Sequence, residues 1–259
     1  MRKKLALFHI AHSYRYVSKL LWMYQIQLYR GKGQGMGKKQ SKGKCLLCNS
    51  IVAKAGMTKH LQSCLDKNVI SEKTSGDRKS QKGNKFFHIL VERYHEYWIH
   101  LKISSDARLK DLDDFLRDIW LECCGHLSAF EIQGTRYSSS PMTEYDEKSM
   151  SRKLGDILGQ DIKFFHEYDF GTTTTLALRV VSEREAEITG KTIQVLARNE
   201  PPSITCNNCN NLATHICAEC IYSGEGWLCD KCAHEHECGE DMLLPVVNSP
   251  RVGMCGYTG

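Results

Sequence analysis

Hydrophobic and polar residues alternate in several short runs along the middle of the chain. One run carries apolar side chains at Phe87, Ile89 and Val91, and another extends from Tyr97 to Ile103 with the same spacing. A period of two residues is typical of β-strands that bury one face. By this criterion we expect further strands at residues 127–132, 136–137, 162–168, 173–181 and 193–197. Gly171 would lie in the turn of a hairpin formed by residues 162–168 and 173–181.

A different spacing follows Ser105 and Asp106, where apolar residues recur every three or four positions. This spacing predicts a helix with one apolar face, and aspartates in its first turns would suit the helix dipole. The apolar face consists of Leu109, Leu112, Phe115, Leu116, Ile119 and Trp120. A single helical turn is expected at residues 153–158. Two strands, a helix and then several strands predict an α+β fold that resembles a β-grasp.

Ten of the thirteen cysteines fall into two clusters that also contain histidine. The first cluster has the order Cys45-x2-Cys48-x11-His60-x3-Cys64. Thiolate and imidazole are ligands that zinc binds in tetrahedral sets of four, and a CxxC turn offers two of them at once. His60 and Cys64 would share one face of a helix, with Met57 and Leu61 packed beneath the metal. We therefore predict a zinc finger with the C2HC ligand set.

The second cluster holds enough ligands for two more zinc ions, so that about three Zn²⁺ are expected per chain. Its members are Cys206, Cys209, Cys217, Cys220, Cys229, Cys232, His234, His236 and Cys238. His215 and Cys255 are spare candidates. Protein atoms can fill every coordination position, which indicates structural rather than hydrolytic zinc. Disulfides are the alternative, but the spacings are typical of zinc sites and no convincing signal peptide precedes them.

The order of ligands in the second cluster resembles that of B-box and related cross-brace modules. In those modules the first and third ligand pairs share one zinc, and the second pair and the tail share another. The resemblance implies one site at Cys206, Cys209, Cys229 and Cys232, and a second at Cys217 and Cys220 with two of His234, His236 and Cys238. The gap between Cys220 and Cys229 is longer than in B-box modules, which leaves this pairing open.

Composition divides the chain into five segments. Residues 66–85 are polar, with several serines and glycines, as is typical of a linker, and Pro201-Pro202 closes the domain that begins at Phe86. Residues 1–35 are interpreted as a disordered leader or as the result of a start assigned at Met1 instead of Met36; a secretory or transit peptide is the alternative. The predicted order is the leader (1–35), the C2HC finger (36–66), a basic linker (67–85), the α+β domain (86–200) and a Cys/His-rich module (201–259).

Four segments of the central domain resemble the plasmid pRiA4b ORF-3-like family, whose members are also labelled passenger TnpR-like proteins of insertion elements. They are YWIHLKI (97–103), LKDLDDFL (109–116), GHLSAFEI (125–132) and YDFG (168–171). The resemblance covers residues 86–185 and implies a bacterial or mobile-element context. Many members continue after YDFG with acidic residues, tryptophan and histidine, whereas this chain has Thr172-Thr173-Thr174-Thr175-Leu176.

Two further candidates lie in the central domain. His126 with Asp169 could form an acid–base dyad, although such residues are more often hydrogen-bonded at a strand edge. Cys123-Cys124 could be reactive thiols, although small apolar residues are the more common role. We therefore predict no catalytic residues.

Charge is distributed unevenly along the chain. Residues 1–85 contain 19 Lys/Arg and 3 Asp/Glu, whereas residues 86–259 contain 16 and 27. A basic end suggests binding to a polyanion such as nucleic acid, and a solvated leader without a partner is the alternative. Lysines that could contact phosphate are Lys38, Lys39, Lys42, Lys44, Lys54 and Lys59.

These observations together predict a cytoplasmic, zinc-binding, non-enzymatic adaptor. It would bind nucleic acid with low specificity through its basic N-terminal part and a protein through the central and C-terminal modules. No apolar run approaches the ~18 to 20 residues of a membrane span, so no membrane contact is expected. The alternatives are a pure protein–protein interaction module, or a nuclease or hydrolase that uses His126 and Asp169.

Overall fold

The structure is a computed structural model that describes residues 41–74, 85–185 and 192–259, with the backbone alone for 68–74. The leader predicted at residues 1–35 and the alternative start at Met36 lie outside the described residues. The described part has mixed α and β structure, with a large sheet and few helices, as predicted. The finer expectation of a β-grasp is not confirmed. None of the described helices is long and apolar enough to cross a bilayer.

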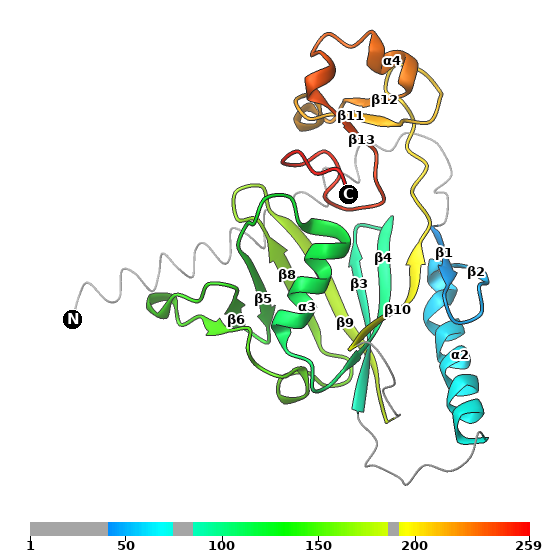
Figure 1. Cartoon of the computed structure of the whole chain (residues 1–259), viewed down its shortest axis with the longest axis vertical. Helices are drawn as coiled ribbons and strands as arrows, with labels where there is room; N and C mark the ends of the chain where they lie inside the picture. The colour runs from blue at the N-terminus through cyan, green and yellow to red at the C-terminus, as the bar shows by residue number, and fades with distance from the viewer. Residues whose placement is uncertain (1–40, 75–84, 186–191) are drawn as a thin grey trace. The chain divides into compact units, whose positions relative to one another are not determined.

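A sheet of ten strands forms the centre of the described residues (Figure 1). Its order is β2-β1-β10-β4-β3-β9-β8-β5-β6-β7, with the single parallel pair at β6 and β7. The strands are β1 (Lys42–Cys45), β2 (Ile51–Ala53), β3 (Lys85–Arg93), β4 (Tyr97–Ser104), β5 (Ser128–Ile132), β6 (Thr135–Ser138), β7 (Lys148–Ser149), β8 (Lys163–Tyr168), β9 (Thr174–Glu185) and β10 (Ile193–Asn199). All strands predicted from the alternation are present, including the β8–β9 hairpin.

The helix α3 (Leu109–Leu116) covers one face of this sheet (Figure 1) and continues as a π-helical turn, η1 (Arg117–Leu121). Its predicted apolar face is confirmed, since Leu109, Leu112, Leu116 and Trp120 are fully buried. They belong to one core cluster with strand residues such as Ile89 and Leu101. Short 3-10 turns follow at η2 (Thr143–Tyr145) and η3 (Leu154–Asp156), the second within the turn predicted at 153–158.

The predicted zinc finger packs on the sheet through a second core cluster. Its strand β1 pairs with β10, so the finger hairpin extends the central sheet. Helix α2 (Lys54–Thr74) buries Met57, Leu61 and Leu65 in a cluster that also contains Trp98 and Leu90. Side chains alternate along a strand, so β3 and β4 bury residues on both faces of the sheet. Ile89 and Leu101 pack on the face covered by α3, whereas Leu90 and Trp98 pack in the finger cluster.

Helix α2 extends into the segment predicted to be a linker. The helix runs to Thr74, so the linker expected at residues 67–85 begins inside it. No glycine or proline occurs between Gly56 and Gly76, and nothing in the sequence therefore ends the helix earlier. Residues 75–84 lie outside the described part.

The Cys/His-rich module at the C-terminus has a small sheet of its own. Its strand order is β12-β11-β13. The elements are β11 (His215–Cys217), η4 (Cys220–Ser223), β12 (Trp227–Leu228), α4 (Asp230–His234), η5 (Glu240–Met242) and β13 (Leu243–Pro245). Its own buried cluster contains only Cys206, Leu228, Cys229 and Ala233. Ile216 is buried in the central core cluster, with Ile221, Trp227 and Leu244 packed against it, but the module's own core is too small to stabilise it alone.

Residues 246–257, which we call the C-terminal strap, return from this module to the central domain. The Asn248 side chain exchanges hydrogen bonds with Asn199 at the end of β10. Ser249 donates to the carbonyl oxygen of Trp120 at 2.6 Å. Val252 joins the core cluster beneath α3, and Ile216 of β11 belongs to the same cluster. The strap therefore contacts both the central domain and the C-terminal module.

Candidate metal centres

Four groups of cysteine and histidine side chains converge in the described part of the chain. Within each group the four ligand atoms all lie within 4.8 Å of one another. A tetrahedron with Zn–S bonds of about 2.3 Å has S···S edges of about 3.8 Å, close to the 3.5–3.8 Å seen between sulfur pairs in three of the groups. All thirteen cysteines are free thiols rather than disulfides. The geometry suits four zinc ions, one more than the three expected from the sequence.

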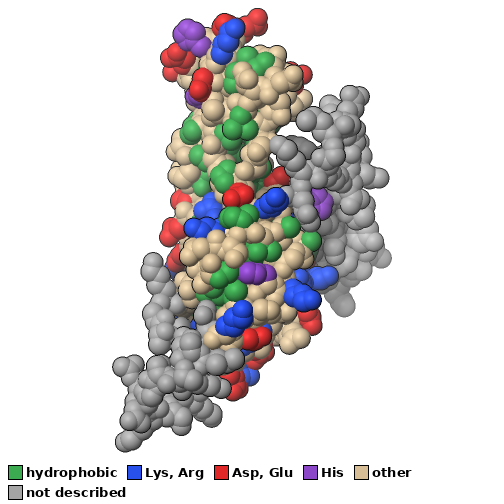
Figure 2. All heavy atoms as spheres, turned by 90° about the vertical axis from the view of Figure 1, so that its right-hand side faces the viewer, with side chains coloured by type: hydrophobic (Ala, Val, Ile, Leu, Met, Phe, Trp, Pro, Cys, Tyr) green, Lys and Arg blue, Asp and Glu red, His purple; other side chains and the backbone are tan. Residues whose placement is uncertain are grey.

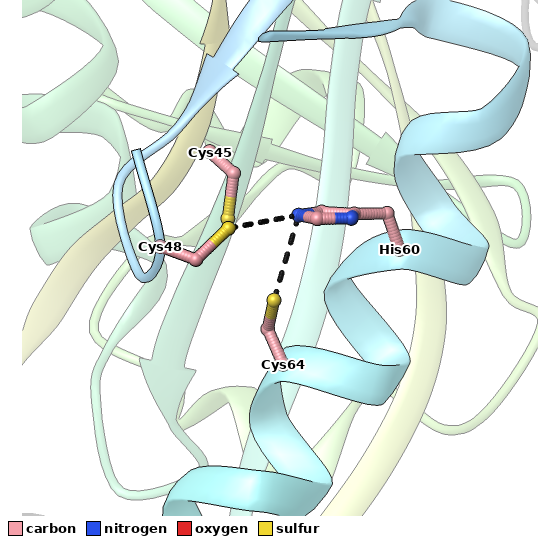
Figure 3. Close-up of side chains that lie close together, drawn as sticks. All are labelled: Cys45, Cys48, His60 and Cys64. Atoms are coloured by element: carbon pink, nitrogen blue, oxygen red, sulfur yellow. Dashed lines mark hydrogen bonds between the residues drawn. The ribbon is translucent and has the colours of Figure 1, made fainter. Parts of the chain in front are cut away.

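The first group is Cys45, Cys48, His60 and Cys64, the set predicted for the finger. Figure 3 shows the two cysteines of the β1–β2 hairpin facing the two ligands of α2. The His60 Nε2 atom lies 3.2 Å from the Cys48 sulfur and 3.4 Å from the Cys64 sulfur. As the four-residue spacing predicts, His60 and Cys64 share one face of the helix.

The hairpin that carries the first two ligands has a tight turn. The Asn49 amide donates to the Cys45 carbonyl, and Asn49 has a positive φ of 63°, which asparagine tolerates better than most residues. A hydrogen bond with the Ser50 hydroxyl lowers the pKa of Cys48 to about 6, whereas burial raises the pKa of Cys64 to about 11. Closely spaced thiols cannot all be ionised at once, because the thiolates would repel one another. A bound metal cation removes this repulsion and displaces the remaining protons.

The second group lies in the C-terminal module and joins two CxxC turns. It consists of Cys206, Cys209, Cys229 and Cys232. The Cys209 sulfur is 3.6 Å from that of Cys229 and 3.8 Å from that of Cys232. Burial raises the pKa of Cys206, but hydrogen bonds from backbone amides, that of Cys229 first, outweigh it and lower the pKa to about 6. This group is the one that the cross-brace resemblance implied.

The third group interleaves with the second along the sequence. It consists of Cys217, Cys220, His236 and Cys238. The Cys220 sulfur is 3.5 Å from His236 Nε2 and 3.6 Å from the Cys238 sulfur, and the Cys220 amide points at the Cys217 sulfur. Of the three tail candidates, His234 is outside the group, although it was one of the predicted ligands. The spare candidate His215 instead contacts Thr214 and Asp230.

Sequence reasoning missed the fourth group, which consists of Cys123, Cys124, His126 and Cys255. Cys123 packs against the central core, as expected of a small apolar residue, whereas Cys124 is exposed, and both thiols lie at a ligand cluster. A signal exists in the Cys-Cys-x-His order, which places three ligands within four residues. The fourth ligand comes from the strap, 129 residues after His126, and only folding brings it close.

The proposed acid–base dyad is brought together but is not free. His126 Nε2 lies 3.6 Å from Asp169 Oδ2, yet the same nitrogen lies 3.0 Å from the Cys124 sulfur and 3.3 Å from that of Cys255. Asp169 Oδ1 accepts hydrogen bonds from the amides of Gly171 and Thr172, and Oδ2 pairs with Arg251. Both partners are therefore engaged in the β8–β9 turn and the fourth cluster.

No protein-family model matches the chain, and no curated protein matches it. Among solved structures, it is similar to the crystal structure of a protein of unknown function, MM3350 from Methanosarcina mazei Go1. That match has 15% sequence identity and a TM-score of 0.40, and it covers 45% of this chain and 70% of the other. Similarity at this level carries no argument about function.

Proposed function

We propose that this protein is a zinc-stabilised, non-enzymatic adaptor that binds nucleic acid through its basic N-terminal part and a protein through its central and C-terminal modules. The observation that carries the proposal is the completeness of the clusters. Each offers four protein ligand atoms, which is the arrangement of structural zinc, whereas catalytic zinc keeps one position for water or substrate. The metals would then serve to hold binding surfaces in place.

Lysines on β1 and α2 support the nucleic-acid side of this proposal. Lys42, Lys44, Lys59 and Lys67 are exposed, and such side chains can neutralise phosphates. Lys54, one of the predicted phosphate contacts, is instead paired with Glu92 at 3.0 Å. Lys38 and Lys39 lie outside the described residues.

The distribution of charge on the described surface suggests that it contributes only weakly to nucleic-acid binding. Figure 2 shows lysine and arginine side chains interspersed with acidic ones on the side of the molecule that it displays. A single finger reads about three base pairs, so this arrangement favours weak binding with little sequence preference. The N-terminal charge of residues 1–40 would add to it.

For the protein-binding side, the C-terminal module exposes Leu212, Tyr222 and Met242. Tyrosine and methionine are among the residue types enriched in protein–protein interfaces. Membership of the pRiA4b ORF-3-like family, with a β-grasp and a mobile-element context, remains part of the proposal and rests on the sequence motifs. The enzymatic alternative gains no support from Asp169, because both of its oxygens are engaged.

The proposal is tested by the salt dependence of binding to a generic duplex. Each phosphate contact contributes a slope of about −0.9 to the plot of log K against log salt. Replacing Lys42, Lys44 and Lys59 by glutamate should weaken binding and reduce the slope by up to about 3. The matched control replaces the exposed Lys148, Lys163 and Lys231. Equal effects in both variants, or a flat salt dependence, would favour a pure protein–protein module.

A further inference from the structure

We propose that Cys123, Cys124, His126 and Cys255 hold a zinc ion that clasps the C-terminal strap to the central domain. The proposal is independent of nucleic-acid binding, because it concerns the fourth cluster and not the finger. The first three ligands lie between η1 and β5, and the fourth lies near the end of the strap. A metal ion at this place would close a loop of more than a hundred residues.

The spacing of the four side chains is that of a ligand set. Cys124 lies 3.5 Å from Cys255 between sulfurs, and Cys123 lies 3.7 Å from Cys124. A disulfide would need about 2.05 Å. Three sulfurs and an imidazole nitrogen form a soft, four-coordinate set, which is typical of zinc.

A buried cation next to the cluster fits the charge of a loaded site. Zinc with three thiolates and a neutral imidazole carries a net charge of −1. The guanidinium of Arg251 is fully buried and donates to the Cys123 sulfur at 3.5 Å and to Asp169 at 2.5 Å. A buried arginine needs compensating negative charge, which Asp169 supplies. The Cys123 sulfur, as a zinc-bound thiolate, would accept a charge-assisted hydrogen bond from the same guanidinium. Hydrogen bonds to ligating groups of this kind hold them in position around a metal.

The backbone at the cluster is shaped to aim these ligands. Cys255 has a φ of 50°, which is uncommon for a residue other than glycine, asparagine or aspartate, and Gly256 follows with a φ of 67°. Gly125, between Cys124 and His126, has a φ of 80°. The two glycines adopt a positive φ without strain, but at Cys255 this conformation costs free energy, and proteins retain such residues mostly where a site requires them.

The clasp would stabilise contacts on both sides of the strap. Arg251 Nη1 donates to the carbonyl oxygen of Thr172 at 2.6 Å, which ties the strap to the β8–β9 turn. On the other side, a Cβ at Gly253 would lie 2.5 Å from Ile221 and 3.0 Å from Ile216, so the strap runs directly against the C-terminal module. The fourth metal would thus couple this module to the central domain.

The fourth cluster also differs from the others in exposure. Each of the other three contains at least one buried cysteine, whereas here Cys124 and Cys255 are exposed and Cys123 and His126 are half-buried. Ligands open to solvent let a chelator reach the metal. We therefore expect the clasp to lose its zinc before the other sites.

The test measures zinc per chain in the full-length protein, together with hydrogen exchange of residues 246–257. The intact protein should hold four zinc ions, in line with its four clusters, and a limiting amount of chelator should remove one first. Cys255→Ser should lower the count by one and speed exchange of the strap about tenfold. Met254→Ser, one residue away, should change neither.

Rescue separates a lost ligand from a damaged fold. Cys255→His keeps a ligand at the same position and should restore the fourth zinc and slow exchange. An intact protein that holds no more zinc than Cys255→Ser would overturn the proposal. So would a disulfide between Cys124 and Cys255 in protein purified without oxygen. If the intact protein held the fourth zinc but did not bind a nucleic-acid duplex, the proposed function would be wrong and the clasp would still be supported.

Discussion

The described part of the finger, residues 41–66, and the part of the Cys/His-rich module before the strap, residues 204–245, have the same kinds of metal ligand but differ in how they pack. The finger adds a strand to the central sheet and buries Met57, Leu61 and Leu65 against it. The C-terminal module has strands of two or three residues. Two of the four buried residues in its own cluster, Cys206 and Cys229, are candidate ligands.

This difference separates two uses of a metal site. Burying three side chains of this kind stabilises the docked finger by about 1.5–3 kcal/mol each, before any metal is bound. The C-terminal module buries little in a core of its own, although Ile216 is buried in the central core cluster. Binding of structural zinc, worth about 10–16 kcal/mol in isolated fingers, would supply a large part of its folding free energy. Similar cysteine spacing therefore does not imply similar dependence on metal.

The largest expected effect is the loss of the C-terminal module in Cys229→Ser. Cys229 is buried and belongs to both the ligand group and the module's small core. Its replacement should release zinc and expose residues 204–245 to proteolysis, with the central sheet left intact. The exposed Met242→Ser is the control. A module that stays protected without its metal would remove the proposed contrast with the finger.

A smaller effect is expected for the corresponding change in the finger. Cys48→Ser should lower the zinc count by one, but β1 should remain paired with β10 because the apolar contacts of α2 persist. Hydrogen exchange at Gly43 and Lys44 would rise only modestly, and thermal unfolding would shift by less than in Cys229→Ser. Release of the whole hairpin from the sheet would show that the finger depends on metal as strongly as the module does.

The sequence predicts the features that depend on neighbouring residues and misses those that arise only when distant segments pack together. Apolar residues at every second position locate the strands of the central domain, and apolar residues at every third or fourth position locate α3. Both patterns arise because one face of each element is apolar and the other polar. The second buried face was not predicted, because His88 and His100 interrupt the pattern on the side that carries Leu90 and Trp98, and polar side chains suggest solvent. CxxC spacing locates ligands that are close in sequence. It carries no information about Cys255, whose partners are reached only when the strap folds back.

Those two histidines provide a pH test of the interface beneath the finger. His88 Nε2 and His100 Nδ1 are 2.8 Å apart and both rings are buried. Burial, reinforced by Arg184 and Arg179, lowers the pKa of His88 to about 4, and burial with the nearby His88, Arg179 and Lys54 lowers that of His100 well below 6.5.

In this pair the unfolded chain binds protons that the folded chain does not. The two neutral histidines therefore do not reduce the free energy of unfolding above pH 6.5. As the pH decreases toward 4, this free energy falls by about 1.4 kcal/mol per pH unit for each histidine. The free energy of unfolding of the central domain, measured by urea denaturation with excess zinc, should show this slope between pH 6.5 and 5. A His88→Leu, His100→Leu variant should lose that part of the slope, and an unchanged slope would mean that other groups produce it.

The smallest expected effect compares two glycines of the finger. A Cβ at Gly43 of β1 would lie 2.3 Å from the Arg198 carbonyl oxygen and 2.4 Å from the Trp98 ring, whereas a Cβ at Gly56 of α2 would meet only Val52, at 3.6 Å. Gly43→Ala must push β1 away from β10, and we expect a loss of about 1–3 kcal/mol, as for other overpacked sites. Gly56→Ala adds no clash and favours the helix, so a gain of up to about 1 kcal/mol is expected. Urea denaturation of both variants measures the difference. If Gly43→Ala were neutral, close packing of β1 on Trp98 would not be what attaches the finger to the sheet, and the metal would have to take a larger part.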